Sequence, residues 1–440
     1  MAGSIPLKLA VAYTFLLPLI LLWIIASWPK LFEGKDKIFL AAFLFVISSA
    51  LVAIFGIDPL HSIRGLFSLG FVILTIPLFA DIVRTSRGYL VLLCLISGQA
   101  VSGFYSAIHA GFFPLLPRLF LGKVTESGQM GLTLLVATGF LIFITSKRSV
   151  SPWQNLSKFA PLAPRHLIRS VAYFSLLCFI GFASAFGLSK VVVSLLLISV
   201  LCGFYFVVMK ARLSFKALDF EEAFRSVILQ IIIPCILAGL LVNLKRGPWS
   251  GILVGGGLLL FLYGRKLIVP ALIAGIFLLA FVEPIKLRIE HSSRDFFIYG
   301  GRNAIWQIGV ELVPKYPLGI GYGNSSFLQK FSSQIPGELK HFHNNLLNIA
   351  VETGWISLFI FGWWVSLLFW RSFDRRFHWC PLVPALGCSF LSWQIAGLVE
   401  YNVGDSEVMI VVYVLTGSLI AISTHERISA ALQLEDEVAL

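Results

Sequence analysis

Apolar runs of membrane-spanning length recur along most of this 440-residue chain and leave few folds open to it. An α-helix needs about 20 consecutive apolar residues to cross a hydrocarbon core about 30 Å thick, and runs of roughly that length follow one another here. The composition agrees, because 58% of the residues are hydrophobic and only 13% are charged. Soluble domains average about 25% charged residues. We therefore expect an all-α polytopic integral membrane protein.

The apolar runs predict about 12 or 13 transmembrane helices, with one long polar loop between two of them. The loop covers residues 284–345 and is expected to contain short helices. It belongs to the middle of three regions: N-terminal helices in 1–226, a core in 227–370, and C-terminal helices with a short tail in 371–440. The expected spans are 7–27, 38–56, 65–80, 89–109, 128–145, 171–187, 190–209, 227–243, 250–263, 267–283, 345–370, 382–400 and 406–422.

Basic residues concentrate in four short loops, which predicts the orientation of the helices. These loops cover 146–170, 210–216, 264–266 and 371–376, and cytoplasmic loops of membrane proteins are enriched in lysine and arginine. The long loop 284–345 then falls on the external side, which is the periplasm for a bacterial inner membrane. The net charge of +12 follows from such loops, so membrane lipids are the expected surroundings and nucleic acid is not an expected partner.

The long loop ends in a cluster of histidines and asparagines immediately before the next apolar run. Its sequence is His341-Phe342-His343-Asn344-Asn345. An imidazole can accept a proton from a hydroxyl near neutral pH, so His343 is the candidate catalytic base. His341 lies two residues away and Asn344 can orient a neighbouring group, which makes both candidate substrate-binding residues. The alternative is that the asparagines only cap the following helix.

Two external arginines are candidates for binding an anionic group. Arg246 lies in a turn between two apolar runs, preceded by Lys245 and followed by Trp249. Arg302 lies inside the long loop, before a glycine-rich segment at 317–323. Guanidinium groups bind phosphate oxygens through paired hydrogen bonds. Alternatively, these charges are ordinary residues at the membrane surface and Trp249 is an interfacial anchor.

Three further charged residues on the external side, Arg64, Glu400 and Asp405, are additional candidates for substrate binding. Charges at helix ends often serve only as interfacial anchors. The aspartates are isolated, with no Asp-x-Asp pair of the kind that holds Mg²⁺, so neither a metal nor a cofactor is expected. The six cysteines form no Cys-x-x-Cys pair and are expected to serve packing.

These motifs and their order resemble the O-antigen ligase and O-antigen polymerase superfamily. The resemblance lies in residues 227–370, where an arginine turn, two apolar runs and an external loop with an arginine and a histidine–asparagine pair follow one another. A GT-C-like arrangement of helices is what this resemblance implies for the fold. The residues that carry it are Arg246-Gly247-Pro248-Trp249, Arg302 with Trp306, Pro317-Leu318-Gly319-Ile320-Gly321, His343-Asn344 and Gly354.

The resemblance implies glycan transfer from an undecaprenyl-diphosphate-linked donor at the periplasmic face of the inner membrane, without a metal. By position, Arg246 and Arg302 would hold the diphosphate as it leaves. His343 would act as base on the acceptor hydroxyl, which attacks the anomeric carbon and inverts it. Lys245 stands where the family usually has a serine, so it is a second candidate for the phosphate.

Three functions stay open at the level of the sequence. A ligase would pass the glycan to lipid A-core, and the single external loop and the His-Asn…Gly spacing favour this function. A polymerase would pass the glycan to a second lipid-linked glycan with the same donor chemistry. A transporter or flippase for a lipid-linked sugar is less favoured. Transporters place charges near the membrane midplane, whereas the polar residues here gather at one face.

Overall fold

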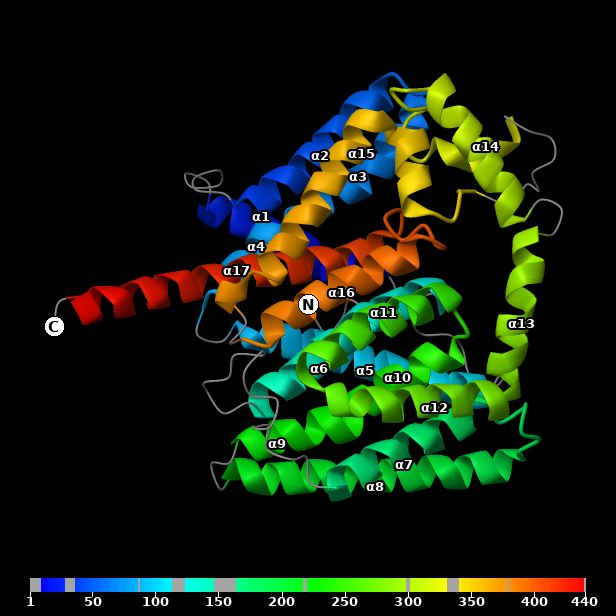
Figure 1. Ribbon diagram of the computed structural model, residues 1–440, viewed down its shortest axis with the longest axis vertical. Helices are drawn as coiled ribbons and strands as arrows, with labels where there is room; N and C mark the ends of the chain where they lie inside the picture. The colour runs from blue at the N-terminus through cyan, green and yellow to red at the C-terminus, as the bar shows by residue number, and fades with distance from the viewer. Residues whose placement is uncertain are drawn as a thin grey trace. The chain divides into compact units, whose positions relative to one another are not determined.

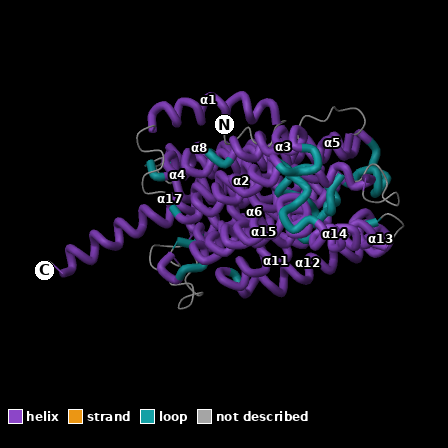
Figure 2. Tube along the Cα trace, turned by 90° about the horizontal axis from the view of Figure 1, so that it is seen from above, coloured by secondary structure: helices purple, strands orange, loops and turns teal. Residues whose placement is uncertain are grey.

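Helices form all of the regular secondary structure in the described part of the protein, for which we have a computed structural model (Figure 1, Figure 2). The described residues are 9–27, 36–85, 88–112, 123–145, 164–216, 220–297, 301–330, 340–377 and 380–438. Several of the helices are long and apolar. The all-helical membrane fold expected from the apolar runs is therefore confirmed.

The chain forms two compact units, of which unit 1 comprises Met1–Tyr13, Leu90–Glu290 and Arg375–Trp393. Its main helices are α5 (Tyr89–Phe112), α6 (Lys123–Thr145), α7 (Pro164–Gly181), α8 (Lys190–Lys216), α9 (Phe220–Val227), the π-helix η3 (Ile228–Ile232), α10 (Ile233–Val242), α11 (Arg246–Tyr263), η4 (Arg265–Leu267) and α12 (Ile268–Phe281). In this unit α10 packs against α6 and α7, and α11 packs against α6.

Unit 2 comprises Thr14–Tyr89, His291–Asp374 and Gln394–Leu440. Its helices are α2 (Lys37–Ile54), α3 (Pro59–Val72), α4 (Thr75–Val83), α14 (Arg302–Lys315), η5 (Asn324–Lys330), α15 (Asn345–Ser372) and α17 (Ser406–Val438). α2 lies along α15, and α4 packs against α17 (Figure 1). Asp36 caps α2 and also accepts a hydrogen bond from Arg371 at the end of α15, at 2.8 Å. The remaining helices are α1 (Leu9–Ser27), α13 (Glu283–Phe297), η6 (Arg375–Phe377) and α16 (Leu382–Gly397).

Fewer helices are long and apolar enough to cross a membrane than the hydropathy pattern predicted. Seven described helices meet this requirement by length and composition, or eight if one bent pair counts as a span. The prediction of about 12 or 13 spans is thus too high for the described residues. The seven are Lys37–Ile54, Tyr89–Phe112, Lys123–Ile144, Lys190–Leu213, Ala223–Val242, Asn345–Ser372 and Ser406–Thr424.

The difference arises because the backbone turns inside one apolar run and because other apolar helices are short. The expected span at 65–80 is split by a turn at 73–74, between α3 and α4. The apolar helix α12 has only 14 residues and ends at an 88° bend, beyond which α13 is polar. Other apolar helices have only 10–17 residues: Leu16–Ala26, His166–Gly181 and Leu382–Gly397. A hydropathy window reports the mean polarity of a segment, and that mean contains no information about such turns.

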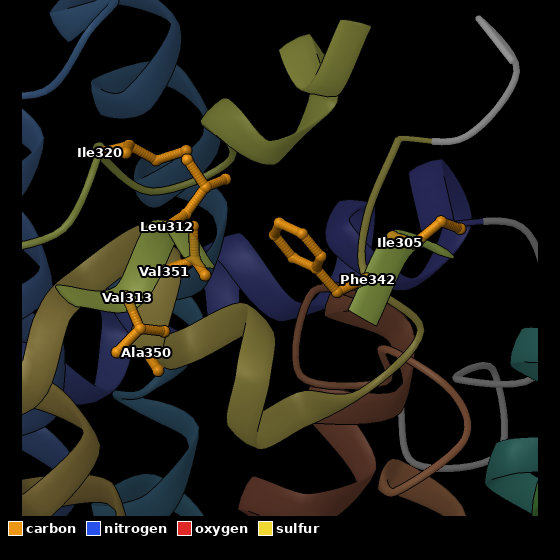
Figure 3. Close-up of a cluster of buried hydrophobic side chains, with 7 residues drawn as sticks. All are labelled: Ile305, Leu312, Val313, Ile320, Phe342, Ala350 and Val351. Atoms are coloured by element: carbon orange, nitrogen blue, oxygen red, sulfur yellow. The ribbon is translucent and has the colours of Figure 1, made fainter. Parts of the chain in front are cut away.

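A buried hydrophobic cluster in unit 2 joins α14 to the first turns of α15 (Figure 3). Phe342, which lies between the two histidines in the sequence, is fully buried in this cluster. Burial of such a side chain stabilises a fold by about 1.5–3 kcal/mol, so this anchor holds the backbone on both sides of it. The members are Ile305, Leu312, Val313, Ile320, Phe342, Ala350 and Val351.

The glycine-rich segment packs backbone against backbone on α15. Gly354 interrupts α15 with a φ of 75°, so the carbonyl groups of the preceding turn lack their helical partners. The carbonyls of Val351 and Glu352 instead accept the N–H groups of Ile320 and Gly321, each at 2.9 Å. These glycines therefore serve the packing of the chain, a use that the glycine-rich motif alone does not distinguish from the close approach of a ligand.

We expect Gly354→Ala to destabilise the protein by at least about 1–3 kcal/mol, the usual cost of a strained backbone conformation. The added Cβ atom would also lie 2.5 Å from the Leu318 carbonyl carbon. Gly362→Ala in the same helix is the matched control, because no described atom lies within 4 Å of its Cβ position. Alanine there should gain about 0.5–1 kcal/mol over glycine. Thermal unfolding in detergent measures both, and equal melting temperatures would contradict the expectation.

Candidate functional site

Three side chains of unit 2 meet at the start of α15, and we call them the Arg302–Glu400–His343 cluster. The Arg302 Nη2 atom lies 3.2 Å from Glu400 Oε1, and the His343 Nδ1 atom lies 3.6 Å from Glu400 Oε2. One carboxylate therefore stands between a guanidinium and an imidazole. The three side chains are 18%, 14% and 23% exposed, in the order of the name. They are held by their surroundings and still open to a ligand.

His343 adopts a backbone conformation that is rare for a residue with a side chain, with a φ of 50°. Hydrogen bonds made by Phe342 and by His343 itself hold the backbone in this conformation. The Phe342 N–H donates to Asn348 Oδ1 at 3.0 Å, and the Phe342 carbonyl accepts from Trp306 Nε1 at 2.8 Å. The His343 N–H donates to His341 Nδ1 at 3.2 Å. Strained residues of this kind cluster at functional sites, which adds to the argument for His343.

His341 stabilises the turn as a neutral imidazole. Burial, followed by the charge of His343, lowers the pKa of His341 to about 4. The ring is therefore uncharged near neutral pH, and its Nδ1 lone pair is available for the His343 N–H. The centroids of the two rings lie 4.1 Å apart. His341 thus supports His343 directly, while its predicted contact with substrate stays a prediction.

The two asparagines after His343 connect α15 to the turn that carries Glu400. Asn344 caps α15 by accepting the Leu347 N–H at 3.0 Å, and its amide donates to the Leu398 carbonyl at 3.0 Å. The buried Asn345 accepts the N–H groups of Asn402 and Val403 at 3.0 and 3.2 Å. The capping alternative for Asn344 thus describes the structure, and contact of Asn344 with substrate stays a prediction.

The arginine turn of unit 1, residues 243–246, is held by buried polar contacts. Asn243 donates to Glu126 Oε2 at 3.2 Å, and Leu244 has a φ of 56°. The Leu244 carbonyl accepts from Arg288 Nε at 3.1 Å. Sequence reasoning missed Glu126, although a carboxylate at the edge of an apolar run is a signal for a functional or positioning role. Arg246 is the first residue of α11, so it directly follows a turn that these contacts hold in place.

Lys245 and Trp249 flank Arg246 in the same unit. The Trp249 indole N–H donates to the Leu240 carbonyl at 3.0 Å, and its ring packs on a buried cluster that includes Val242. Trp249 therefore supports its own turn. Arg246 belongs to unit 1, whereas the Arg302–Glu400–His343 cluster belongs to unit 2. Convergence of Arg246 and Lys245 with that cluster stays a prediction.

The two other predicted residues differ in their surroundings. Asp405 lies directly before α17, and burial, followed by the charges of Glu407 and Glu400, raises its pKa to about 7. Asp405 is thus an electrostatic neighbour of the cluster. Arg64 is exposed on α3, and no hydrogen bond within the described residues joins it to the cluster. No group of three histidine, cysteine or carboxylate side chains in the described residues is placed to hold a metal ion.

The pattern of an arginine turn, a second arginine and a histidine–asparagine pair coincides with a known family. Residues 231–362 match the O-antigen ligase family model. This match confirms the resemblance to the O-antigen ligase and polymerase superfamily. The O-antigen ligase match includes Arg246, Arg302 and His343, while Glu400 lies beyond its end. No curated protein matches the chain. Together with the apolar helices, the O-antigen ligase match supports a bacterial membrane protein.

Proposed function

We propose that this protein transfers a glycan from an undecaprenyl-diphosphate-linked donor to an acceptor hydroxyl at the periplasmic face of the inner membrane. The observation that carries the proposal is the Arg302–Glu400–His343 cluster, two members of which lie in the O-antigen ligase match. An imidazole paired with a carboxylate suits a general base. A nearby guanidinium suits a leaving group that gains negative charge.

In the proposed mechanism, Glu400 orients the His343 ring through Nδ1 and leaves Nε2 to take the proton of the acceptor hydroxyl. The acceptor oxygen forms a bond to the anomeric carbon while the bond from that carbon to the diphosphate oxygen breaks. The electron pair leaves with the diphosphate. Arg302 contacts Glu400 through Nη2, and a guanidinium has five N–H donors. It can therefore bind phosphate oxygens without releasing Glu400.

Arg246 is the second proposed ligand of the diphosphate, with Lys245 beside it and Arg64, Asn344, Glu400, Asp405, His341 and Trp249 as further candidates around the substrate. Lipid A-core is the proposed acceptor, which makes the enzyme a ligase that needs no cofactor. The same donor chemistry would serve a polymerase that uses a second lipid-linked glycan.

Reconstitution of the wild-type protein in liposomes tests the proposal. The liposomes contain a purified lipid-linked glycan donor, either with lipid A-core or without a second acceptor. Glycan attached to lipid A-core is the expected product. Longer lipid-linked glycans formed without that acceptor would support the polymerase. If the donor crosses the bilayer and no glycan is transferred to either acceptor, the proposed function is wrong and a transporter is favoured.

A further inference from the structure

A buried carboxylate in unit 2, Glu352, lies outside the residues that the proposed mechanism uses. Its side chain is 1% exposed and sits in the first turns of α15. Glu352 Oε1 accepts the Ser325 N–H at 3.2 Å and the Ser325 hydroxyl. Glu352 Oε2 accepts the Tyr401 hydroxyl at 3.0 Å. A buried carboxylate is retained in a fold only when such partners compensate for the loss of water.

The partners of Glu352 come from two segments that are far from it in the sequence. Ser325 belongs to η5, in the long external loop, and Tyr401 belongs to the turn between α16 and α17. That turn also carries Glu400, the residue next to Tyr401. The single carboxylate therefore fixes the external loop and the Glu400 turn against α15.

Both partners of Glu352, Ser325 and Tyr401, also lie against the turn that carries His343. The Ser325 hydroxyl, whose single proton serves one acceptor at a time, lies beside Glu352 and also 3.1 Å from the carbonyl oxygen of Lys340, the residue before His341. The Tyr401 ring lies against the His341 ring, with 5.6 Å between centroids. His341 in turn accepts the His343 N–H. Two separate contacts thus connect Glu352 to the backbone and ring that hold His343 in its strained conformation.

We propose that Glu352 is a positioning residue that sets the geometry of His343 and Glu400 through Tyr401 and Ser325. The proposal rests on the proposed function, because it assigns a role in the same site. Glu352 does not touch the reacting atoms. Its removal should therefore slow the transfer step more than it weakens the binding of the donor.

The test uses Glu352→Gln and Tyr401→Phe in the full-length reconstituted protein, with rates expressed per folded molecule. We expect each variant to lower kcat by about tenfold or more, as in losses of orientation, with the KM for the donor changed by less than about twofold. The kcat of the double variant should be close to that of the less active single variant, because both substitutions break the same Glu352–Tyr401 contact. Glu311→Gln and Tyr316→Phe, at exposed positions of unit 2, are the matched controls and should keep wild-type rates.

A second measurement separates this proposal from the proposed function. The rate at which diethyl pyrocarbonate labels His343, followed by mass spectrometry, reports the geometry of the imidazole without any transfer reaction. We expect the labelling rate to change in both Glu352→Gln and Tyr401→Phe and to stay constant in the two controls. Unchanged labelling and an unchanged kcat per folded molecule would overturn the role of Glu352. If the wild type shows no transferase activity while the two variants still change the labelling rate, the positioning role of Glu352 stands and the proposed function is wrong.

Discussion

His343→Ala is expected to lower the rate of glycan transfer by about 10²–10⁴-fold, the usual contribution of a general base. The KM for the donor should change little, because the imidazole is proposed to act on the acceptor hydroxyl. Glu400 Oε2 lies 3.6 Å from Nδ1 of the ring and is proposed to orient it, so water should be a poor replacement for the base. The measurement is initial-rate transfer from a purified lipid-linked donor in proteoliposomes.

His291→Ala is the matched control for this substitution. His291 is an exposed histidine on α13, in the same loop 284–345 and the same compact unit. His291→Ala tests for unspecific effects of losing an imidazole at this surface, and the transfer rate of this variant should equal that of the wild type. If His343→Ala transfers glycan at a rate within about threefold of the control, His343 is not the base.

Arg302→Ala is expected to lower kcat/KM for the donor by about 10²–10³-fold, as measured for the loss of one transition-state donor in other enzymes. Two effects add in this variant. The diphosphate loses a ligand, and Glu400 loses the guanidinium that lies 3.2 Å away. Arg302→Lys restores the charge but not the forked geometry of the donors, so it should recover only part of the rate.

Arg294→Ala is the matched control, because Arg294 is an exposed arginine on α13 in the same unit. This substitution removes one positive charge from the loop 284–345 without touching the cluster, and the kinetics of the variant should match those of the wild type. Equal loss of kcat/KM in Arg294→Ala and Arg302→Ala would assign the effect to overall charge. Full activity of Arg302→Ala would remove Arg302 from the proposed site.

Local patterns in the sequence were sufficient to predict the helical membrane fold, whereas the external side of the loop and the roles of His343 and Arg302 stay predictions. Apolar runs of helix length allow few other folds. His343 and Arg302 stand out because polar residues in a mostly apolar chain have little packing reason to cluster. For the described residues, the same reasoning overestimated the number of membrane-spanning helices. A turn such as the one at 73–74 leaves the mean polarity of the apolar run unchanged.

The sequence by itself therefore determined the class of fold, the resemblance to the O-antigen ligase and polymerase superfamily and the residue types of the candidate site. Only the tertiary structure decided which of these residues meet. The Arg302–Glu400 pair joins positions 98 residues apart, and the Glu352–Tyr401 bond joins positions 49 apart. Hydropathy and short motifs report only on residues that are close together in the sequence. Pairs of this kind depend on the packing of α14, α15 and the α16–α17 turn, which forms only when distant segments bury their surfaces together.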